Sequence, residues 1–410
     1  MAEERAVLAG IVSGRINKEF SDEATMLELA ELAKTAGAEV ASSVLQPKEA
    51  PDVATYLGSG KLEELKELCE VNEANLVIFD DELTGSQQKN IEDALGIRVI
   101  DRSTLILDIF ASRAMSKEGK LQVELAQLKY MLPRLTGMGQ SLSRLGGGIG
   151  TRGPGETKLE SDRRHIRTRI SHLISELKEV ERRRGYARDR RKKDGVLTVS
   201  LVGYTNAGKS TLMNHLTDAG VLAENKLFAT LDTTSRALTL PDDREVLLID
   251  TVGFIRKLPH HLINAFKSTL EEAVFADVIL NVIDFSNPEH KIHRAVSEDI
   301  LNSLGCGEIP KINVYNKCDL AEGTYKPDED NIYISAATGQ GIEELLKLIA
   351  IKIPYPFKRM NLLIPYDKSG FASSVRTDGK LLSEDYLADG IKIIADIEGK
   401  SVHKYEQFRV

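Results

Sequence analysis

The chain of 410 residues has room for roughly two to four domains, and it is 42% hydrophobic and 28% charged, as folded globular proteins are. No uncharged apolar run approaches the length of about 20 residues that a membrane span needs, and three scattered cysteines argue against a disulfide framework or a zinc site. With no secretory signal at the amino terminus, these features predict a cytoplasmic protein, and loose association with a membrane stays open.

Charge is distributed unevenly along the chain, whose formal net charge is −8 at neutral pH. Residues 152–193 contain 15 Lys and Arg residues against 7 Asp and Glu residues, so the rest of the chain carries a net charge of −16. An acidic protein rarely binds nucleic acid, but one strongly basic element is a candidate for docking on a polyanion. The alternative for this segment is a solvated helix face.

Residues 1–115 alternate short apolar runs with helical periodicity. Four apolar runs predict strands, at residues 6–12, 38–45, 75–79 and 97–100. Three segments with apolar residues three or four positions apart predict helices, at residues 22–36, 62–71 and 87–95. Gly37 and Gly96 follow two of these helices, where C-caps are expected. The alternation predicts a small α/β domain with a parallel sheet.

Residues 116–193 carry two heptad-like series of apolar residues. The first series comprises Leu121, Leu125, Leu128 and Leu132, and the second comprises Leu159, Ile166, Ile170, Leu173, Leu177 and Val180. Pairing the two predicts an antiparallel helical hairpin. Its connection is predicted to run from Pro133 to Thr157, is rich in glycine, and carries three arginines, Arg134, Arg144 and Arg152. We expect this connection to be a binding tip with basic flanks, and the alternative is a disordered linker.

An apolar strand predicted at residues 196–202 leads directly into a glycine-rich loop. The loop has the G-x-x-x-x-G-K-[ST] pattern of a nucleotide-binding P-loop and comprises Gly203, Tyr204, Thr205, Asn206, Ala207, Gly208, Lys209, Ser210 and Thr211. Its glycines let backbone N–H groups converge on phosphates. We expect Lys209 to be catalytic by neutralising the β- and γ-phosphate oxygens, and the Ser210 hydroxyl to bind Mg²⁺.

Two segments downstream are predicted to contact the γ-phosphate and Mg²⁺. A buried strand at 245–249 ends in four candidate nucleotide-binding residues, Asp250, Thr251, Val252 and Gly253. Asp250 is expected to hold Mg²⁺ and the Gly253 N–H to bind the γ-phosphate, as a catalytic contact that exists only with a triphosphate. A mobile loop is predicted before this strand and comprises Phe228, Ala229, Thr230, Leu231 and Asp232. Its Thr230 is expected to close over Mg²⁺ and the γ-phosphate as a third catalytic contact.

Two further loops are predicted to recognise the base. The strand at 311–315 leads into Asn316, Lys317 and Asp319. A carboxylate at Asp319 accepts hydrogen bonds from both N1–H and the exocyclic amine of guanine, whereas adenine offers no such pair. A loop after the run 331–334 is positioned for backbone contact with guanine O6 and comprises Ser335, Ala336 and Ala337.

These motifs follow one another in the order found in GTPases, and residues 196–355 resemble the translation-factor-related small GTPases. Three segments narrow the resemblance to the HflX family of ribosome-associated GTPases: Phe-Ala-Thr-Leu-Asp at 228–232, Asp-Thr-Val-Gly-Phe at 250–254 and Gly-Pro-Gly-Glu-Thr-Lys-Leu-Glu at 153–160. Tyr-Leu-Gly-Ser-Gly-Lys at 56–61 fits as well, and the resemblance covers residues 5–355.

The resemblance implies a monomeric GTPase that converts GTP and water to GDP and phosphate with Mg²⁺. It also implies binding to the large ribosomal subunit and the intact ribosome, with rRNA contacts through the basic hairpin and its tip, and separation of stalled or idle ribosomes into subunits under stress. Weak ATP binding in the amino-terminal domain stays open. However, the segment 57–62 lacks the hydroxyl residue of a phosphate loop, and we interpret it as a turn that opens a helix. The alternatives are a signalling switch that acts on a protein effector and an RNA-dependent NTPase.

Two residues bear on the mechanism of hydrolysis. Phe254 stands where many switch GTPases have the glutamine that orients the attacking water. A phenyl ring cannot align water, so we expect slow intrinsic hydrolysis that accelerates on docking. In related GTPases with Asn at the position of Asn206, K⁺ takes the place of an arginine finger. A K⁺ site at Asn206 therefore stays open, beside the alternative that Asn206 only stabilises the turn.

The patterns together predict an α/β chain of four parts. An amino-terminal parallel-sheet α/β domain at 1–115 carries a helical hairpin with a Gly-rich tip loop and basic flanks at 116–193. A P-loop GTPase domain at 194–355 and a small α+β domain at 356–410 follow. The last part has two β-like runs, at 361–364 and 391–397, and a helical stretch at 370–376. Its sequence indicates no function.

Overall fold

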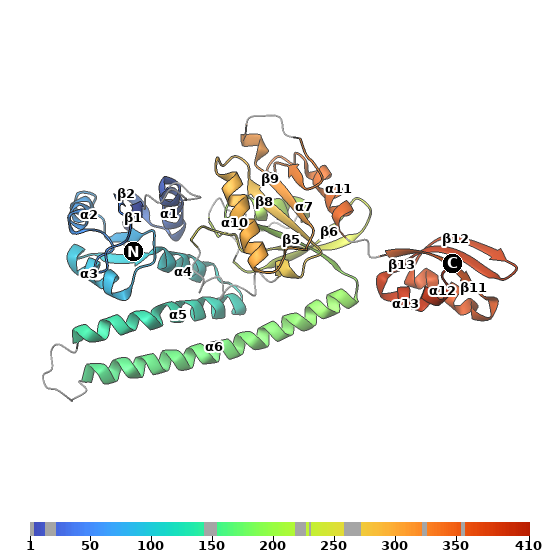
Figure 1. The fold of residues 1–410 in the computed structure, drawn as a ribbon, viewed down its shortest axis with the longest axis horizontal. Coiled ribbons are helices and arrows are strands. Elements are labelled where there is room, and N and C mark those ends of the chain that lie inside the picture. The colour runs from blue at the N-terminus through green and yellow to red at the C-terminus, as the bar shows by residue number, and fades with distance from the viewer. Residues whose placement is uncertain are drawn as a thin grey trace.

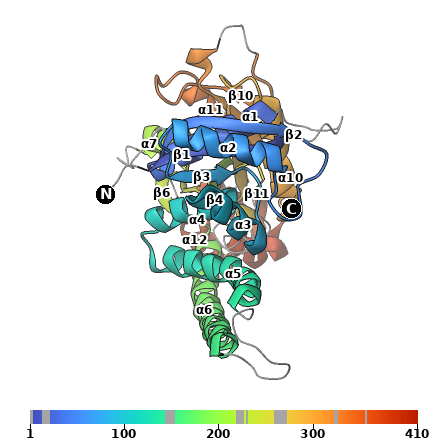
Figure 2. The same ribbon diagram turned by 90° about the vertical axis from the view of Figure 1, so that its left-hand side faces the viewer.

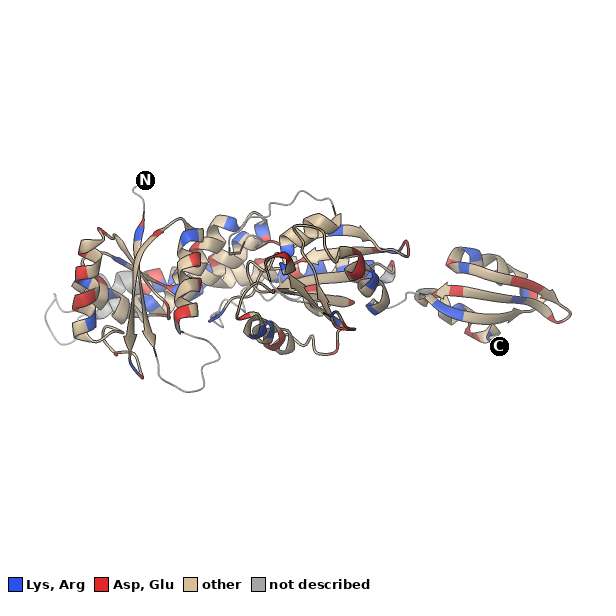
Figure 3. Cartoon of the chain, turned by 90° about the horizontal axis from the view of Figure 1, so that it is seen from above, with Lys and Arg blue, Asp and Glu red and all other residues tan. Residues whose placement is uncertain are grey.

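A computed structural model of the chain contains three β-sheets placed one after another along the long axis of the molecule (Figure 1). It describes residues 4–12, 22–142, 154–217, 227–228, 231–257, 272–321, 326–353 and 357–410. A four-stranded sheet lies at one end, a six-stranded sheet in the middle and a three-stranded sheet at the other end (Figures 1 and 3). A long helical hairpin runs beneath the first two sheets (Figure 1). The predicted fold class is confirmed.

The amino-terminal sheet is parallel, with the strand order β2-β1-β3-β4. Its strands are β1 (Arg5–Val12), β2 (Glu39–Pro47), β3 (Leu76–Phe79) and β4 (Arg98–Asp101), and its helices are α1 (Asp22–Ala36), α2 (Ser59–Val71), α3 (Gly85–Leu95) and α4 (Arg102–Arg113). Alternate strand residues face opposite sides, so α1 and α4 pack in one apolar cluster with β1 and β3, and α2 and α3 pack in another. The predicted strands and helices of this part are confirmed.

Helix α4 is not among the predicted elements. Its apolar residues form an almost continuous run, which shows no clear helical period, and they are buried: Leu105, Ile106, Leu107, Ile109 and Phe110. Asp101 caps the helix, because its carboxylate accepts a hydrogen bond from the Thr104 N–H at 2.9 Å. This helix leads directly into the hairpin.

The hairpin consists of α5 (Lys117–Leu142) and α6 (Pro154–Lys193), as the two apolar series predict. Leu121, Leu125 and Leu173 form its buried apolar cluster. Figure 2 shows that the two helices lie together on one side of the amino-terminal sheet. Among the described residues, no helix is both long and apolar enough to cross a lipid bilayer.

The connection between the hairpin helices is shorter than predicted, because Pro133 and Arg134 lie inside α5. Arg134 Nη2 donates to the Leu83 carbonyl at 2.7 Å, and its guanidinium carbon lies 3.3 Å from the centre of the Tyr130 ring. These contacts attach α5 to the amino-terminal domain. They stabilise the helix beyond Pro133, although the proline removes one backbone hydrogen bond. Arg134 is therefore not a tip residue. The other two arginines predicted for the tip lie outside the described residues, Arg144 and Arg152.

The central sheet has the strand order β10-β9-β8-β5-β7-β6, and only β6 runs antiparallel to its neighbour. Its strands are β5 (Leu197–Gly203), β6 (Thr234–Thr239), β7 (Glu245–Asp250), β8 (Val278–Asp284), β9 (Lys311–Asn316) and β10 (Asn331–Tyr333). The described residues of this part form the helices α7 (Lys209–Thr217), α10 (His290–Ser303) and α11 (Ile342–Lys352), with a short turn η2 (Cys318–Leu320). The central strands are buried on both faces, which explains their continuous apolar runs.

The carboxyl-terminal sheet is antiparallel, in the order β11-β13-β12. Its elements are β11 (Phe357–Ile364), β12 (Gly379–Leu387), β13 (Gly390–Glu398), α12 (Ser369–Asp378) and α13 (Val402–Tyr405), with single turns η3 (Tyr366–Lys368), η4 (Gly399–Ser401) and η5 (Glu406–Phe408). Leu362, Ile393 and Tyr405 are completely buried in its core. Strand β12 was not predicted, because most of its side chains are polar or exposed.

Replacing Leu173 by Ala tests the packing of the hairpin. Leu173 is completely buried between α5 and α6, so the substitution should lower the free energy of unfolding by about 2–5 kcal/mol. The measurement is urea denaturation followed by circular dichroism at 222 nm. Leu27→Ala is the matched control, because Leu27 is 69% exposed on α1, and it should change stability by less than about 0.5 kcal/mol. Equal losses in the two variants would contradict the predicted packing.

Candidate nucleotide-binding site

The P-loop connects the carboxyl end of β5 with the amino end of α7. Gly203 and Gly208 have φ angles of 139° and 93°, which favour glycine. A Cβ atom at Gly203 would lie 2.1 Å from the Val282 carbonyl oxygen, and one at Gly208 would lie 2.2 Å from Asn316 Nδ2. Both positions therefore need glycine, and the loop can approach its neighbours closely. The predicted strand, loop and helix are all present.

The ammonium group of Lys209 is buried within this loop. Its Nζ donates to the carbonyl oxygens of Gly203 at 3.1 Å and Tyr204 at 2.9 Å. Burial lowers the pKa of Lys209 to about 8, and the nearby Asp250 carboxylate opposes part of that shift. A buried, poorly solvated cation is well placed to bind a phosphate anion, whose charge would restore the ordinary pKa.

Ser210 and Asp250 meet beside the lysine. The Ser210 hydroxyl donates to Asp250 Oδ2 at 3.1 Å, and the Asp250 carboxylate is completely buried. A Cβ atom at Gly253 would lie 2.9 Å from Lys209 Nζ, so the backbone of Gly253 passes directly by the lysine. Three predicted residues therefore converge on Lys209.

The hydroxyl and carboxylate oxygens of Ser210 and Asp250 are donors of the kind that Mg²⁺ prefers. Among the residues that the structure describes, no group of three or more His, Cys, Asp or Glu side chains could hold a metal ion. This donor set fits an ion that is bound by few protein ligands and by phosphate oxygens and water, as Mg²⁺ usually is. Two residues of the predicted mobile loop lie outside the described residues, Ala229 and Thr230.

The predicted base loops join the P-loop through Asn316. Its Nδ2 donates to the Ala207 carbonyl at 2.8 Å, and its Oδ1 accepts from the Ala336 N–H at 2.9 Å. Lys317 has a φ of 65°, and its ammonium donates to Asp284 Oδ2 at 2.7 Å. These contacts fix the loops on both sides, while the Asp319 side chain is exposed.

The last predicted loop lies against the base loop. The Cys318 N–H donates to the Ile334 carbonyl at 3.1 Å, and Ser335 is completely buried, with its hydroxyl accepting from the Thr338 N–H at 3.2 Å. Ala336 is buried and Ala337 is exposed. The structure therefore brings the P-loop and both base loops together at the carboxyl edge of the central sheet, where ligands of open α/β sheets bind.

Phe254 points into the protein interior. It is 1% exposed and packs with Val202 and Leu301, and its carbonyl accepts from the Thr205 N–H at 2.7 Å. The ring therefore cannot reach a water molecule at the phosphates, in agreement with the expectation from the sequence.

Several predicted site residues have their side chains engaged elsewhere. The Thr251 hydroxyl donates to the Leu201 carbonyl at 2.7 Å. Three further predicted site residues, Phe228, Leu231 and Val252, lie in an apolar cluster with α1, α4, α5 and the amino-terminal sheet. Ile255 belongs to the same cluster. Phe228 meets Phe110 edge to face, with ring centres 4.7 Å apart. The segments that flank the nucleotide site are thus partly embedded in the core of the amino-terminal part.

The predicted nucleotide contact of Asp232 is not formed by its side chain. The carboxylate instead accepts hydrogen bonds from the backbone N–H groups of Met115 and Ser116, at 2.9 Å and 2.8 Å. The carboxylate of Asp232 is therefore directed at the start of α5. Sequence spacing could not reveal this, because the partners lie more than 100 positions apart.

A buried polar network that the sequence did not indicate joins the P-loop to the amino-terminal domain. The Tyr204 hydroxyl donates to Glu28 on α1 and accepts from the Arg256 N–H at 2.8 Å. Arg102 pairs with both Glu28 and Asp80. Burial raises the pKa of Glu28, and Arg102 opposes this shift.

His293 on α10 completes this network on the other side of Tyr204. The two rings stack with centres 3.9 Å apart, and Arg256 Nη2 lies 2.8 Å from His293 Nε2. Burial, and then the positive charge of Arg256, lower the pKa of His293 to about 4. The histidine therefore stays neutral at physiological pH and serves as a packing partner for the P-loop tyrosine.

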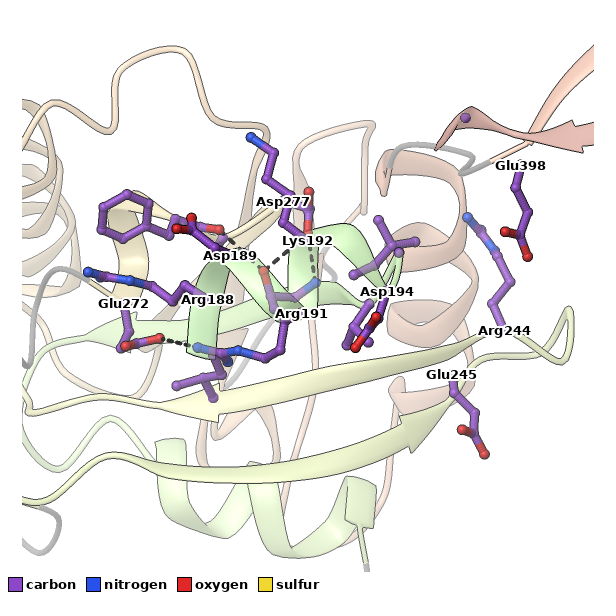
Figure 4. A pocket seen from close by; sticks show the side chains of 18 of the residues that line it. Arg188, Asp189, Arg191, Lys192, Asp194, Arg244, Glu245, Glu272, Asp277 and Glu398 are labelled. Atoms are coloured by element: carbon purple, nitrogen blue, oxygen red, sulfur yellow. Dashed lines mark hydrogen bonds and ion pairs between the residues drawn. The ribbon is translucent and has the colours of Figure 1, made fainter. Parts of the chain in front are cut away.

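A separate pocket of about 860 Å³ lies where α6 meets the central and carboxyl-terminal sheets (Figure 4). Leu197 and Glu245, at the amino ends of β5 and β7, contribute to its lining. The P-loop lies at the opposite edge of the same sheet, so this pocket is not the nucleotide site. Arg191 pairs with Glu272 at 3.5 Å across it, which joins the end of α6 to the central domain.

Comparison with known proteins gives matches along most of the chain. Residues 23–111 match a family described as "GTP-binding GTPase N-terminal", residues 113–191 one described as "GTP-binding GTPase Middle Region", and residues 198–317 one described as "50S ribosome-binding GTPase". The chain is 54% identical to the GTPase HflX of Caldanaerobacter subterraneus subsp. tengcongensis, over 96% of this chain and 91% of that protein. It is 43% identical to the GTPase HflX of Escherichia coli, over 89% and 86%.

Among solved structures, the chain is similar to a GTP-binding protein from the archaeon Sulfolobus solfataricus, crystallised in complex with GDP. The identity is 29%, the match covers 85% of this chain and 98% of that protein, and the TM-score is 0.46.

The buried position of Lys209 predicts proton uptake when nucleotide binds. With a pKa of about 8, part of the lysine population is neutral at pH 8.5, and the phosphate charge of GDP should protonate it. Calorimetric titration with GDP, in buffers of different ionisation enthalpy, should show an uptake of about half a proton or more at pH 8.5 and less at pH 6.5. Lys209→Arg stays protonated throughout and should lack this rise. A proton uptake that is independent of pH in the wild type would contradict the assignment of Lys209 as the residue that binds the phosphates.

Proposed function

Because the chain belongs to the HflX family of GTPases, we propose that it binds the large ribosomal subunit and separates stalled or idle ribosomes into subunits under stress. In this proposal residues 194–355 bind and hydrolyse GTP, residues 116–193 dock on rRNA, and the ribosome stimulates hydrolysis. The observation that carries it is the match of residues 198–317 to a family described as "50S ribosome-binding GTPase", together with a basic hairpin whose residues contact Asp232 and Thr233 of the central domain.

In this proposal each group of side chains at the nucleotide site has a role. Lys209 and the Gly253 N–H bind the β- and γ-phosphates, and Asp319 recognises guanine next to the loops that Asn316 holds. Ser210 and Asp250, with Thr230, are the proposed ligands of Mg²⁺, which when bound neutralises phosphate charge. The proximity of the Ser210 hydroxyl and the Asp250 carboxylate supports that assignment.

At the position where many switch GTPases have a glutamine that orients the attacking water, this site has Phe254. Phe254 is buried away from the phosphates, so its ring neither orients water nor accepts its proton. A partner that supplies charge or orients the water can accelerate hydrolysis by about 10³–10⁵. Asn206 is exposed at a left-handed position of the P-loop, with a φ of 60°, and is the proposed site for K⁺.

The hairpin offers the charges for docking on rRNA. Acidic and basic residues are mixed over the three sheets (Figure 3), whereas α6 lies within the segment with a strong basic excess. Arg182 and Arg183 are exposed and both pair with Glu179, at 2.9 Å and 3.3 Å, and Arg184 pairs with Glu118 on α5 at 3.0 Å. Because these exposed ion pairs are weak, Arg182 and Arg183 can exchange Glu179 for phosphates, whereas Arg184 joins the two helices of the hairpin.

The direct test of this proposal is separation of ribosomes. Intact ribosomes are incubated with the protein and either GDP or a non-hydrolysable GTP analogue, and then analysed by sucrose-gradient sedimentation. We expect free subunits with the GTP analogue and few with GDP, because affinity depends on the nucleotide state. Intact ribosomes under both conditions would contradict the proposal, and they would favour a switch that acts on a protein effector.

Charge reversal of Arg182 and Arg183 should weaken binding to the large subunit. The slope of log affinity against log salt concentration should become smaller by about one per lost phosphate contact. The double variant Arg182→Glu/Arg183→Glu is compared with Arg182→Lys/Arg183→Lys, which keeps the charge and should bind as the wild type does. Equal salt dependence in the two double variants would show that these arginines do not contact rRNA.

Asp319→Asn should exchange the base specificity of the site. The amide no longer accepts both guanine hydrogen bonds, so GTP affinity should fall on the order of 100-fold or more, and xanthosine triphosphate should become the preferred nucleotide. The measurement is competition with a fluorescent nucleotide. Asp243→Asn is the control, because Asp243 lies in the turn between β6 and β7, and it should leave specificity unchanged. Retained preference for GTP in Asp319→Asn would refute the role of Asp319.

A further inference from the structure

Asp232 joins the segment after the predicted mobile loop to the start of the hairpin. Its carboxylate accepts hydrogen bonds from the N–H groups of Met115 and Ser116, at 2.9 Å and 2.8 Å, and from the Ser116 hydroxyl. All three donors lie directly before α5, which begins at Lys117. One side chain of the nucleotide-binding domain thus satisfies polar groups at the amino end of a helix in another domain.

The arrangement is a capping box completed from a distance. Ser116 acts as the N-cap of α5, because its hydroxyl accepts from the Gly119 N–H at 2.8 Å. In an ordinary capping box, a Glu or Gln at the third helical position reaches back to the N–H of the capping residue. Here the third position is Gly119, and Asp232, 116 positions from Ser116, supplies the carboxylate instead.

Gly119 is explained by the same contact. A Cβ atom at this position would lie 2.5 Å from Asp232 Oδ1, so no larger residue fits without displacing the carboxylate. Glycine is one of the poorest helix formers, and nothing in the helix itself requires it here. The carboxylate of Asp232 therefore explains why the third residue of α5 is a glycine.

Neighbouring contacts hold the same segment against both helices of the hairpin. Arg184 on α6 pairs with Glu118 on α5 at 3.0 Å and donates to the Thr233 hydroxyl at 3.4 Å. Leu231 is 3% exposed and packs in the apolar cluster that includes Val123 of α5. Residues 231–233 thus touch α5 through apolar and polar contacts and α6 through an arginine.

The segment also leads directly to the nucleotide site. Strand β6 begins at Thr234, which pairs with Asp250 at the end of β7. Asp250 in turn accepts from the Ser210 hydroxyl of the P-loop. A displacement of the hairpin relative to the central sheet therefore reaches, through Thr233, the strand beside the proposed Mg²⁺ ligand.

We propose that Asp232 is a positioning residue that ties residues 231–233 to the start of α5 and so couples docking of the hairpin to GTP hydrolysis. This inference rests on the proposed function, because it concerns how the large ribosomal subunit stimulates the site. Asp232 itself does not touch the nucleotide in this account. It acts by holding residues 231–233, which precede β6, in one position relative to the hairpin.

Three substitutions separate this role from the alternatives. Asp232→Ala removes the acceptor of these hydrogen bonds, and Asp232→Asn keeps an amide oxygen that can accept from the N–H groups of both Met115 and Ser116. Gly119→Ala displaces the carboxylate while strengthening the helix, because alanine is the better helix former. The quantity measured is the ratio of the hydrolysis rate with large subunits to the rate without them.

We expect this ratio to fall about ten-fold in Asp232→Ala and in Gly119→Ala and to stay within about two-fold of the wild type in Asp232→Asn. Asp385→Ala, which removes an exposed carboxylate from β12, is the matched control and should behave as the wild type. Equal losses of the ratio in Asp232→Asn and Asp232→Ala would show that accepting hydrogen bonds from the N–H groups of Met115 and Ser116 is not what Asp232 contributes, and would overturn the proposal. A normal ratio in Gly119→Ala would overturn it as well.

A second measurement does not depend on ribosomes. Hydrogen exchange of the amides of Met115, Ser116 and Gly119 is compared in the wild type with GDP and with a non-hydrolysable GTP analogue. We expect the exchange rates to differ about five-fold or more between the nucleotides, and this difference to vanish in Asp232→Ala and Gly119→Ala but persist in Asp232→Asn.

The two measurements distinguish the two proposals. If ribosomes do not stimulate the wild type but the exchange rates behave as expected, the proposed function fails and the coupling through Asp232 stands. If the exchange rates of the wild type are the same with both nucleotides, the coupling fails whatever the ribosomes do. Circular dichroism of each variant shows whether a lost effect merely reflects unfolding.

Discussion

The structure depends on one apolar core that two domains share. Phe228, Leu231, Val252 and Ile255 flank the nucleotide site, yet they are 1–5% exposed among side chains of α1, α4, α5 and the amino-terminal sheet. Withdrawing a fully buried Leu or Phe side chain into water costs about 1.5–3 kcal/mol. Neither flanking segment can therefore move without either repacking this core or carrying the amino-terminal domain with it. The nucleotide site and the hairpin are linked by that constraint before any specific polar contact is considered.

Polar groups at the same interface give the shared core a defined geometry. Tyr204 links the P-loop to Glu28, and Arg102 and Arg256 neutralise that buried carboxylate. Removing one member of such a network leaves an uncompensated buried charge, which is strongly destabilising, so the network tolerates few alternative positions. Asp232 adds a second tie at the start of α5. Two sets of polar contacts therefore add to the shared apolar core, one beside the P-loop and one beside β6.

Local signals in the sequence were sufficient for the features that depend on local geometry. The P-loop and the strands around it follow from glycine spacing and from continuous apolar runs, and the hairpin follows from the heptad series around Leu121 and Leu173. Contacts between distant segments leave no such pattern. The continuation of α5 beyond Pro133 depends on where Arg134 binds, and Asp232 looked like a nucleotide ligand because its helix-capping partners are far away in sequence. Gly119 in the first turn of a helix was a detectable signal of close approach, but it does not name the partner.

In the proposed function, Phe254 leaves the usual water-positioning place without a suitable side chain, and docking of the hairpin on the large ribosomal subunit supplies the missing stimulus. The most direct test is the rate of GTP hydrolysis with and without purified large ribosomal subunits, with ATP as a parallel substrate. The account predicts stimulation on the order of 10³-fold or more that is confined to GTP. An unchanged rate of GTP hydrolysis in the presence of saturating subunits, or equal stimulation with ATP, would contradict it.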